Sequence, residues 1–100
     1  MRIKRIDTAS VLTTITAPVR KMCPVLHETD EGQVVITYQT EGSAYELHDL
    51  AKYLADFASM AISHEDFTDL VAQALHADVT STWTTAGMGV TCRASYPAGQ

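Results

Sequence analysis

The fold of this chain is decided by the stretch Gln33-Val34-Val35-Ile36-Thr37-Tyr38-Gln39-Thr40 and the triplet Glu41-Gly42-Ser43 that follows it. In the first stretch, apolar side chains recur at every second position, and this period of two is typical of a β-strand. The triplet predicts a turn. After the turn, apolar residues recur at helical spacing, which predicts a helix over about residues 44–60. A strand that leads directly into a helix indicates a mixed α and β fold.

Four further elements flank this unit. Residues 10–17 are rich in β-branched side chains and predict a strand that Pro18 ends, so residues 19–32 are expected to form a long connection. Ser63, with Asp66 three residues later, predicts the N-cap of a second helix that ends near His76. Residues 78–84 and 90–95 predict two more strands on either side of Gly87-Met88-Gly89. The expected buried faces are Leu47, Leu50, Leu54, Phe57 and Ala58 in the first helix and Phe67, Leu70, Val71, Ala74 and Leu75 in the second.

The order of elements is therefore ββααββ, which predicts an α+β fold with a four-stranded antiparallel sheet and two helices on one face. A chain of 100 residues forms a single domain, with a core over about residues 10–95 and a tail at 96–100. Such a sheet is half covered and has open edges, which are a liability for an isolated chain. Copies that join edge to edge into a barrel would remove this liability, so we expect a homo-oligomer.

The overall charge narrows the function classes. The formal net charge is −5, which argues against a general nucleic-acid binder. Five of the seven Lys and Arg residues lie in the first 21 positions, and this basic segment either contacts phosphate or is ordinarily solvated. No run of 18 apolar residues and no secretory signal is present, so we expect a cytoplasmic protein without membrane contact. Two cysteines without a CxxC pattern do not indicate a disulfide scaffold.

Cys23 is the candidate nucleophile. Arg20 and Lys21 lie just upstream, and nearby cations favour the reactive thiolate. Pro24 restricts Cys23 to extended backbone, which would hold the thiol in a defined direction. The alternative is that Cys23 is a small buried apolar residue, as most free cysteines are. Cys92 alternates with apolar residues on one face of the last strand and is expected to be structural.

Three acidic or basic side chains accompany this thiol. Asp30 is either a proton donor or an ordinary turn acid before Gly32. His64 and Glu65 open the second helix, where a carboxylate is also stabilised by the helix dipole. Glu65 could accept hydrogen bonds from the N–H groups of a guanine-like ring edge. The histidines and cysteines show no metal-ligand spacing, so no metal site is expected.

Three motifs together resemble the QueF family of tunnelling-fold (T-fold) proteins, which act on 7-cyano-7-deazaguanine. They are Cys23-Pro24-Val25 with Asp30 seven residues after the cysteine, the segment 46–54, and Ile62-Ser63-His64-Glu65-Asp66-Phe67. The resemblance spans about residues 19–92. It implies a T-fold ββααββ unit in a pentamer- or decamer-like barrel with sites between subunits. It also implies that Cys23 forms a covalent thioimide with the nitrile and that Asp30 donates the proton. Glu65 and His64, with Glu46, are then expected to bind the substrate.

One departure from the family pattern bears on the cofactor. NADPH-dependent reductases of the family carry two lysines where this chain has His48 and Ala51, and Asp49 adds a negative charge. The resemblance therefore favours the QueF-like amidinotransferases, which use ammonia as co-substrate to form the amidine of archaeosine and need no NADPH. The substrate would be the base, free or within tRNA or DNA. The alternatives are an NADPH-dependent nitrile reductase and a non-catalytic T-fold binding or assembly module.

Overall fold

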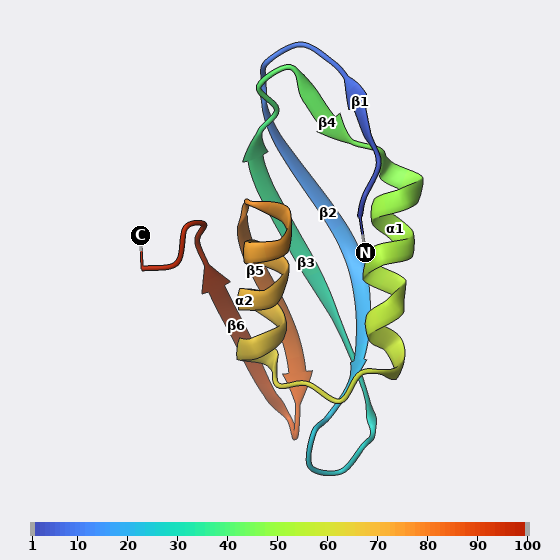
Figure 1. Ribbon diagram of the computed structural model, residues 1–100. Coiled ribbons are helices and arrows are strands. Elements are labelled where there is room, and N and C mark those ends of the chain that lie inside the picture. The colour runs from blue at the N-terminus through green and yellow to red at the C-terminus, as the bar shows by residue number, and fades with distance from the viewer. Residues whose placement is uncertain (1, 100) are drawn as a thin grey trace.

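The structure, a computed structural model, describes residues 2–99. Its elements in chain order are β1 (Arg5–Asp7), β2 (Leu12–Met22), β3 (Thr29–Gln39), β4 (Ser43–Tyr45), α1 (Leu47–Ala55), the 3-10 helix η1 (Asp56–Ser59), α2 (His64–Leu75), β5 (Asp78–Thr85) and β6 (Met88–Ala94). Strands β2, β3, β5 and β6 form an antiparallel sheet in that spatial order. Both helices lie over one face of it (Figure 1). The predicted α+β class and the ββααββ order of the main elements are confirmed.

A second, two-stranded sheet was not predicted. It pairs β1 with β4, and its three residue pairs run from Arg5 opposite Tyr45 to Asp7 opposite Ser43. Strands this short carry no readable alternation, because a period of two needs at least four or five residues to be distinguished. The ends of the predicted domain and tail, residues 1 and 100, lie outside the described part of the chain.

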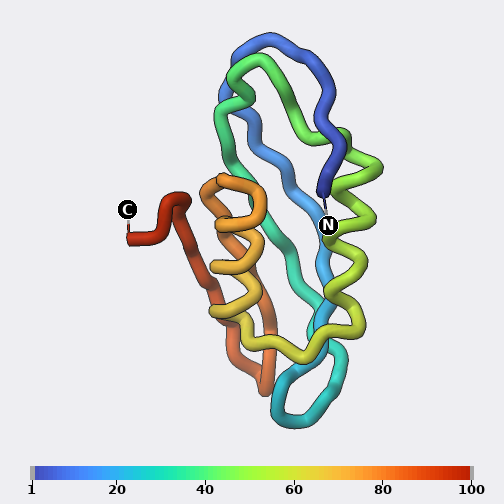
Figure 2. Tube along the Cα trace, in the orientation of Figure 1, coloured from blue at the N-terminus to red at the C-terminus, as the bar shows by residue number. Residues whose placement is uncertain are grey.

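The hairpin of β2 and β3 is longer than the sequence predicted. The expected long connection over residues 19–32 is wrong, because β2 continues through Pro18 to Met22 and β3 begins at Thr29. Pro18 does not end the strand because β2 is an edge strand of the sheet, where a missing backbone N–H is tolerated. Only residues 23–28 remain as a loop, and they project at the tip of the hairpin (Figure 2). Asp30 therefore lies in a strand rather than in a turn.

The first helix is shorter than predicted. Its N-cap is Glu46, whose carboxylate accepts the backbone N–H groups of His48 and Asp49 at 2.8 and 3.2 Å. This cap fixes the start of α1 at Leu47, so residues 44 and 45 are free to pair in β4. Leu50, Leu54 and Phe57 are buried as predicted, whereas Leu47 and Ala58 are exposed.

The second helix begins as predicted, since the Ser63 hydroxyl accepts the backbone N–H of Asp66 at 3.0 Å. It ends at Leu75, with His76 in the left-handed conformation. Its buried face is rotated relative to the prediction. Phe67, Val71 and Leu75 are buried as expected, but Leu70 and Ala74 are exposed, and Thr68 and Ala72 are buried in their place.

The core between helices and sheet is organised around aromatic rings. Phe67 packs edge-to-face on Phe57 and on Trp83, with ring centroids 4.8 and 5.3 Å apart. Trp83 is 3% exposed and lies opposite Gly32 in the β3–β5 ladder. A Cβ atom at Gly32 would overlap the indole ring, so the glycine allows this close approach. Among residues 2–99, no helix is long and apolar enough to cross a membrane.

Candidate functional site

The β2–β3 hairpin brings Cys23 and Asp30 to the same end of the sheet. Lys21 and Asp30 are direct cross-strand partners. Cys23 follows the last residue of β2, and its backbone N–H donates to the carbonyl of Glu28 at 2.8 Å, which continues the hairpin. Cys23 lies two positions after Lys21, just beyond the end of β2, and continued alternation would place its side chain on the helix-covered face. In such a continuation of the ladder, Asp30 would be the diagonal cross-strand neighbour of Cys23, a spacing within reach of side-chain contact.

Asp30 is held by two hydrogen-bond donors. The ammonium of Lys21 donates to Oδ2 at 2.9 Å, and the hydroxyl of Thr85 donates to Oδ1 at 3.5 Å. The side chain of Lys21 is 1% exposed and that of Asp30 is 11% exposed, so the ion pair is shielded from solvent. Hydrogen bonds to both oxygens fix the orientation of the Asp30 carboxyl group. Asp30 is therefore not the ordinary turn acid that sequence reasoning left open.

His64 joins the same cluster from the first turn of α2. Its ring stacks on Trp83, with centroids 4.8 Å apart, while the Lys21 ammonium lies 4.9 Å from the centroid of the same indole. His64 Nε2 lies 2.9 Å from the Thr85 hydroxyl. Because that hydroxyl donates to Asp30, it can accept from Nε2–H, which leaves Nδ1 as an acceptor. Nδ1 is buried and has no hydrogen-bond partner within residues 2–99.

The charge state of His64 follows from these neighbours. Burial lowers the pKa of the imidazole, and the nearby positive charge of Lys21 lowers it further, while Asp30 and Glu65 oppose the effect. His64 is thus held neutral at neutral pH. A neutral imidazole is suited to hydrogen bonding rather than to charge neutralisation.

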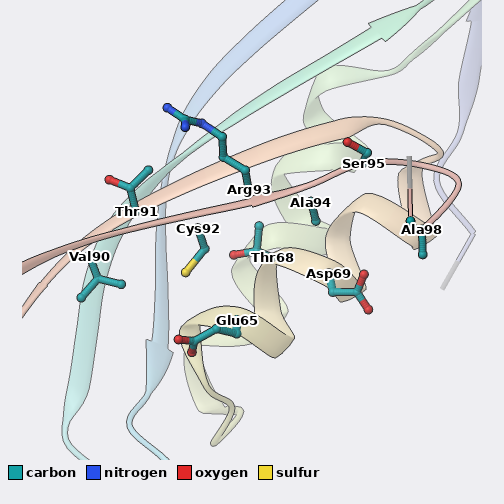
Figure 3. A pocket seen from close by; sticks show the side chains of 11 residues that line it. Glu65, Thr68, Asp69, Val90, Thr91, Cys92, Arg93, Ala94, Ser95 and Ala98 are labelled. Carbon is teal, nitrogen blue, oxygen red and sulfur yellow. The ribbon is translucent and has the colours of Figure 1, made fainter.

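Glu65 faces a separate cavity between α2 and β6. The cavity has a volume of about 530 Å³, and its walls include Glu65, Thr68, Asp69, Val90, Cys92 and Arg93. Figure 3 shows Glu65, Thr68 and Cys92 at one end of it. The carboxylate of Glu65 is at the exposed start of the helix and is accessible to a ligand. A planar bicyclic base is small enough for this volume.

The structural role expected for Cys92 stays a prediction, since its side chain is only partly buried. It shares the helix-covered face with Val90 and Ala94, as the alternation predicted, but it is only half-buried and lines the cavity of Glu65. The core does not close over β6 because β6 is the last strand of the sheet. Burial and the negative charge of Glu65 raise the pKa of the Cys92 thiol. Cys92 is therefore protonated at neutral pH and is a poor nucleophile.

A buried hydroxyl pair connects the cavity to the Lys21–Asp30 cluster. Thr68 and Ser81 are in hydrogen-bond contact at 2.6 Å, and the indole N–H of Trp83 donates to the Ser81 hydroxyl at 2.8 Å. Trp83 thus lies between the two halves of the candidate site: Glu65 and the cavity on one side, Lys21 and Asp30 on the other. Its position is fixed by four polar or aromatic contacts, with Phe67, His64, Lys21 and Ser81.

Glu46 is not brought to this cluster within one chain. It lies at the N-terminus of α1, whereas the residues that lead into His64 follow the other end of that helix (Figure 1). Hydrogen bonds from the backbone N–H groups of His48 and Asp49 lower the pKa of the Glu46 carboxyl. This capping role gives Glu46 a structural function. Its part in substrate binding stays a prediction.

Three residues of the site were not predicted as such. The sequence indicates Lys21 only as an upstream cation, Trp83 only as a strand residue, and Thr85 lies just beyond the predicted strand 78–84. The signal for Lys21 was available, because a lysine that alternates with Val19 on a strand face is expected to point inward and needs a partner. Trp83 and Thr85 reach the site through strand register, which one sequence does not specify. Within residues 2–99, no three His, Cys, Asp or Glu side chains gather as a potential metal site.

Comparison with known proteins gives a match among solved structures. No protein-family model matches the chain, and no curated protein matches it significantly. Among solved structures, the crystal structure of the archaeosine synthase QueF-Like in its apo form is similar, with a TM-score of 0.77 and 19% sequence identity. The similarity covers 87% of this chain and 94% of that chain. At this identity the comparison establishes a shared fold: this chain has the fold of that synthase over nearly its whole length.

Proposed function

We propose that this chain is a QueF-like nitrile-modifying enzyme of the amidinotransferase type, acting on 7-cyano-7-deazaguanine, free or within tRNA or DNA. The observation that carries the proposal is the hairpin geometry, which sets Cys23 diagonally across from an Asp30 that is held in a solvent-shielded ion pair. The shared fold with an archaeosine synthase supports the same assignment.

The first half of the reaction adds the thiol across the nitrile. Asp30 takes the proton of the Cys23 thiol, and the sulfur attacks the nitrile carbon. One π bond of the carbon–nitrogen triple bond opens, and the nitrogen receives the proton from Asp30. The product is a thioimide, and the carboxylate is regenerated. General acid–base assistance of this kind contributes about 10²–10⁴ in rate.

The second half replaces sulfur with nitrogen. Ammonia adds to the thioimide carbon, the carbon–sulfur bond breaks, and the thiol of Cys23 is restored as the amidine leaves. Neither half of the reaction is a net oxidation or reduction, so the reaction requires no hydride donor. The segment that would hold NADPH in a reductase here contains Asp49, whose carboxylate accepts the backbone N–H of Lys4 at 2.6 Å. An aspartate at this place disfavours a nucleotide phosphate.

Recognition of the base is assigned to the start of α2. Glu65 would accept the N–H groups of the guanine-like edge, and the cavity between α2 and β6 offers the volume for the ring system. His64, with its unbonded Nδ1, is linked to Asp30 through the hydroxyl of Thr85. In the proposed enzyme a neighbouring copy completes the site, as edge-to-edge assembly would place another strand beside β6.

The test is the intact mass of the protein after incubation with 7-cyano-7-deazaguanine. We expect a mass increase of one nitrile-bearing base on the wild-type chain and none on Cys23→Ala. The matched control is Cys92→Ala, which should still gain the mass, because the second thiol lacks an acid–base partner. An adduct that persists in Cys23→Ala would refute the nucleophile assignment.

The adduct is then challenged with ammonium and, separately, with NADPH. Discharge by ammonium to an amidine supports the amidinotransferase. Oxidation of NADPH that requires both the nitrile and Cys23 would instead establish a reductase. Should the base bind without any covalent adduct, the chain is a binding module and not an enzyme of this type.

A further inference from the structure

We propose that Lys21 is a positioning residue of this site, which fixes the orientation of the Asp30 carboxyl group toward the Cys23 position of the hairpin. The inference rests on the proposed function of the site and adds a residue to it. It starts from the burial of the side chain: Lys21 is among the largest fully buried residues of the described chain, at 1% exposure. A buried ammonium is costly unless its charge is paired and its donors are satisfied.

The contacts of Lys21 account for this burial. Its ammonium bonds Oδ2 of Asp30 at 2.9 Å and lies over the indole of Trp83 at 4.9 Å from the ring centroid. The aromatic face stabilises the cation, and the carboxylate neutralises it. The second oxygen of Asp30 is bound by Thr85. Asp30 is thereby fixed at two points, so its orientation is set by Lys21 and Thr85 rather than by solvent.

The neighbouring ion pair on the same two strands shows what an ordinary cross-strand pair is here. Arg20 and Glu31 are adjacent to Lys21 and Asp30 in the ladder and are 3.3 Å apart, but their side chains are 67% and 69% exposed. Exposed pairs of this kind add little to stability. The two ion pairs are consecutive in the β2–β3 ladder, but their side chains point to opposite faces of the sheet. Arg20 is therefore a suitable matched control for Lys21.

The charged and titratable groups around Lys21 come from three elements. Asp30 lies opposite on β3, His64 and Glu65 begin α2, and Cys92 lies on β6. Of these, Asp30 is in direct contact with the ammonium. Removal of the Lys21 ammonium therefore acts first on Asp30, which loses the donor to its Oδ2, and it also takes a cation away from the neighbourhood of the Cys23 thiol. An Asp30 whose orientation is no longer fixed is poorly placed to accept the proton of that thiol.

The experiment compares Lys21→Met with Arg20→Met in otherwise unchanged protein. The first readout is the rate at which iodoacetamide alkylates Cys23 across pH 5–9, located by peptide mapping so that Cys92 is counted separately. The second is the rate of adduct formation with 7-cyano-7-deazaguanine over the same range. We expect Lys21→Met to move the acidic limb of both profiles to higher pH. Its adduct rate at neutral pH should fall by up to the ~10²–10⁴-fold that loss of an acid–base group costs.

A double variant separates positioning from folding. Lys21→Met alone leaves an uncompensated buried carboxylate and should lower the melting temperature, whereas Lys21→Met with Asp30→Asn removes both charges and should recover much of it. Adduct formation should stay low in the double variant. Arg20→Met should leave both pH profiles at wild type.

The outcomes distinguish this proposal from the function on which it rests. If Lys21→Met keeps wild-type pH profiles for alkylation and adduct formation, however much its melting temperature falls, Lys21 is only structural and the proposal is overturned. If the wild-type chain forms no adduct but the alkylation profile still moves in Lys21→Met, the proposed reaction fails while the role of Lys21 toward Cys23 stands. Equal effects of Arg20→Met and Lys21→Met would also overturn it.

Discussion

At the scale of single residues, His64 makes the stability of the fold depend on pH. Its folded-state pKa lies below the ordinary value of 6.5, because burial and the charge of Lys21 disfavour the imidazolium. Below about pH 6.5 the unfolded chain therefore binds a proton at this residue more readily than the folded chain does. Above this range His64 is neutral in both states and does not reduce the free energy of unfolding. The free energy of unfolding declines as the pH falls through the range.

We predict that His64→Gln flattens this dependence. The melting temperature of the wild type should fall more between pH 7.5 and 5.5 than that of the variant, because glutamine has no proton to gain. The matched control is His48→Gln, whose ring is 94% exposed and which should keep the wild-type slope. Identical slopes for wild type and His64→Gln would show that His64 is not the group that titrates.

Local sequence indicated the candidate residues Cys23 and Asp30 but not the residues that contact them. Cys23 and Asp30 could be selected because their residue types and their spacing form a short motif that resembles a known family, whereas their roles stay predictions. The role of Lys21 depends on which residue faces it across the ladder, and that register depends on the full length of β2. The sequence prediction ended this strand at Pro18, so it underestimated the length of β2. The stacking of His64 on Trp83 joins two elements 19 positions apart, which local patterns do not encode.

At the scale of elements, the contact of β3 with β5 depends on a single glycine. Gly32 lies opposite Trp83, and a side chain there would collide with the indole and with the backbone carbonyl of Thr82. Because Trp83 contacts both Lys21 and His64, a shift of the ring would disturb the site as well as the core. Sequence reasoning treated Gly32 only as part of a turn.

We predict that Gly32→Ala destabilises the fold by about 1–3 kcal/mol, the usual cost of forcing extra volume into a packed core. The measurement is urea unfolding followed by the fluorescence of Trp83, the only tryptophan of the chain. Gly89→Ala is the matched control, since a Cβ at that strand position meets nothing within 4 Å. Its stability should stay within about 0.5 kcal/mol of wild type. Equal stability of the two variants would mean that the ring moves aside at no cost.

Hydrophobic periodicity predicted the positions of the two helices along the chain better than it predicted which side of each helix is buried. The starts of both helices have side-chain caps, and the cap at Ser63 was predicted correctly. The buried face of α2 was misjudged because a polar residue, Thr68, is buried to bond Ser81, which turns Leu70 outward to 41% exposure. A hydrophobicity pattern assigns threonine to the surface and so rotates the helix in the prediction.

At the scale of the whole molecule, the uncovered face of the sheet does not require a partner. Its exposed side chains are mainly polar, namely Thr14, Thr16, Arg20, Gln33, Thr82, Thr84, Thr91 and Arg93. The half-covered sheet was one reason to expect association of copies, and this reason does not hold, because a polar face is stable in water. The remaining reason is the pair of edge strands, β2 and β6.

The two edges differ in how far they are closed. Near its end, β2 is bridged by the segment before α2: the Met22 N–H donates to the Met60 carbonyl, and the Ile62 N–H donates to the Met22 carbonyl. In the described part of the chain, no strand pairs with the outer edge of β6. The exposed side chains of Leu12 on β2 and Met88 on β6, at 71% and 63%, add apolar area at these edges. An open edge of this kind is a template for strand pairing.

We therefore predict a homo-oligomer in which the edge of β6 is paired with another copy. Light scattering at micromolar concentration should give a mass several times the 10.9 kDa of one chain. Hydrogen exchange should show the amides of Met88–Ala94 protected along the strand, whereas an unpaired edge strand would exchange at every second position, where the N–H faces solvent. Dilution should release that protection without unfolding β3, which lies inside the sheet. A monomeric mass together with alternating fast exchange in β6 would refute the assembly, and with it any site completed by a neighbouring copy beside Glu65.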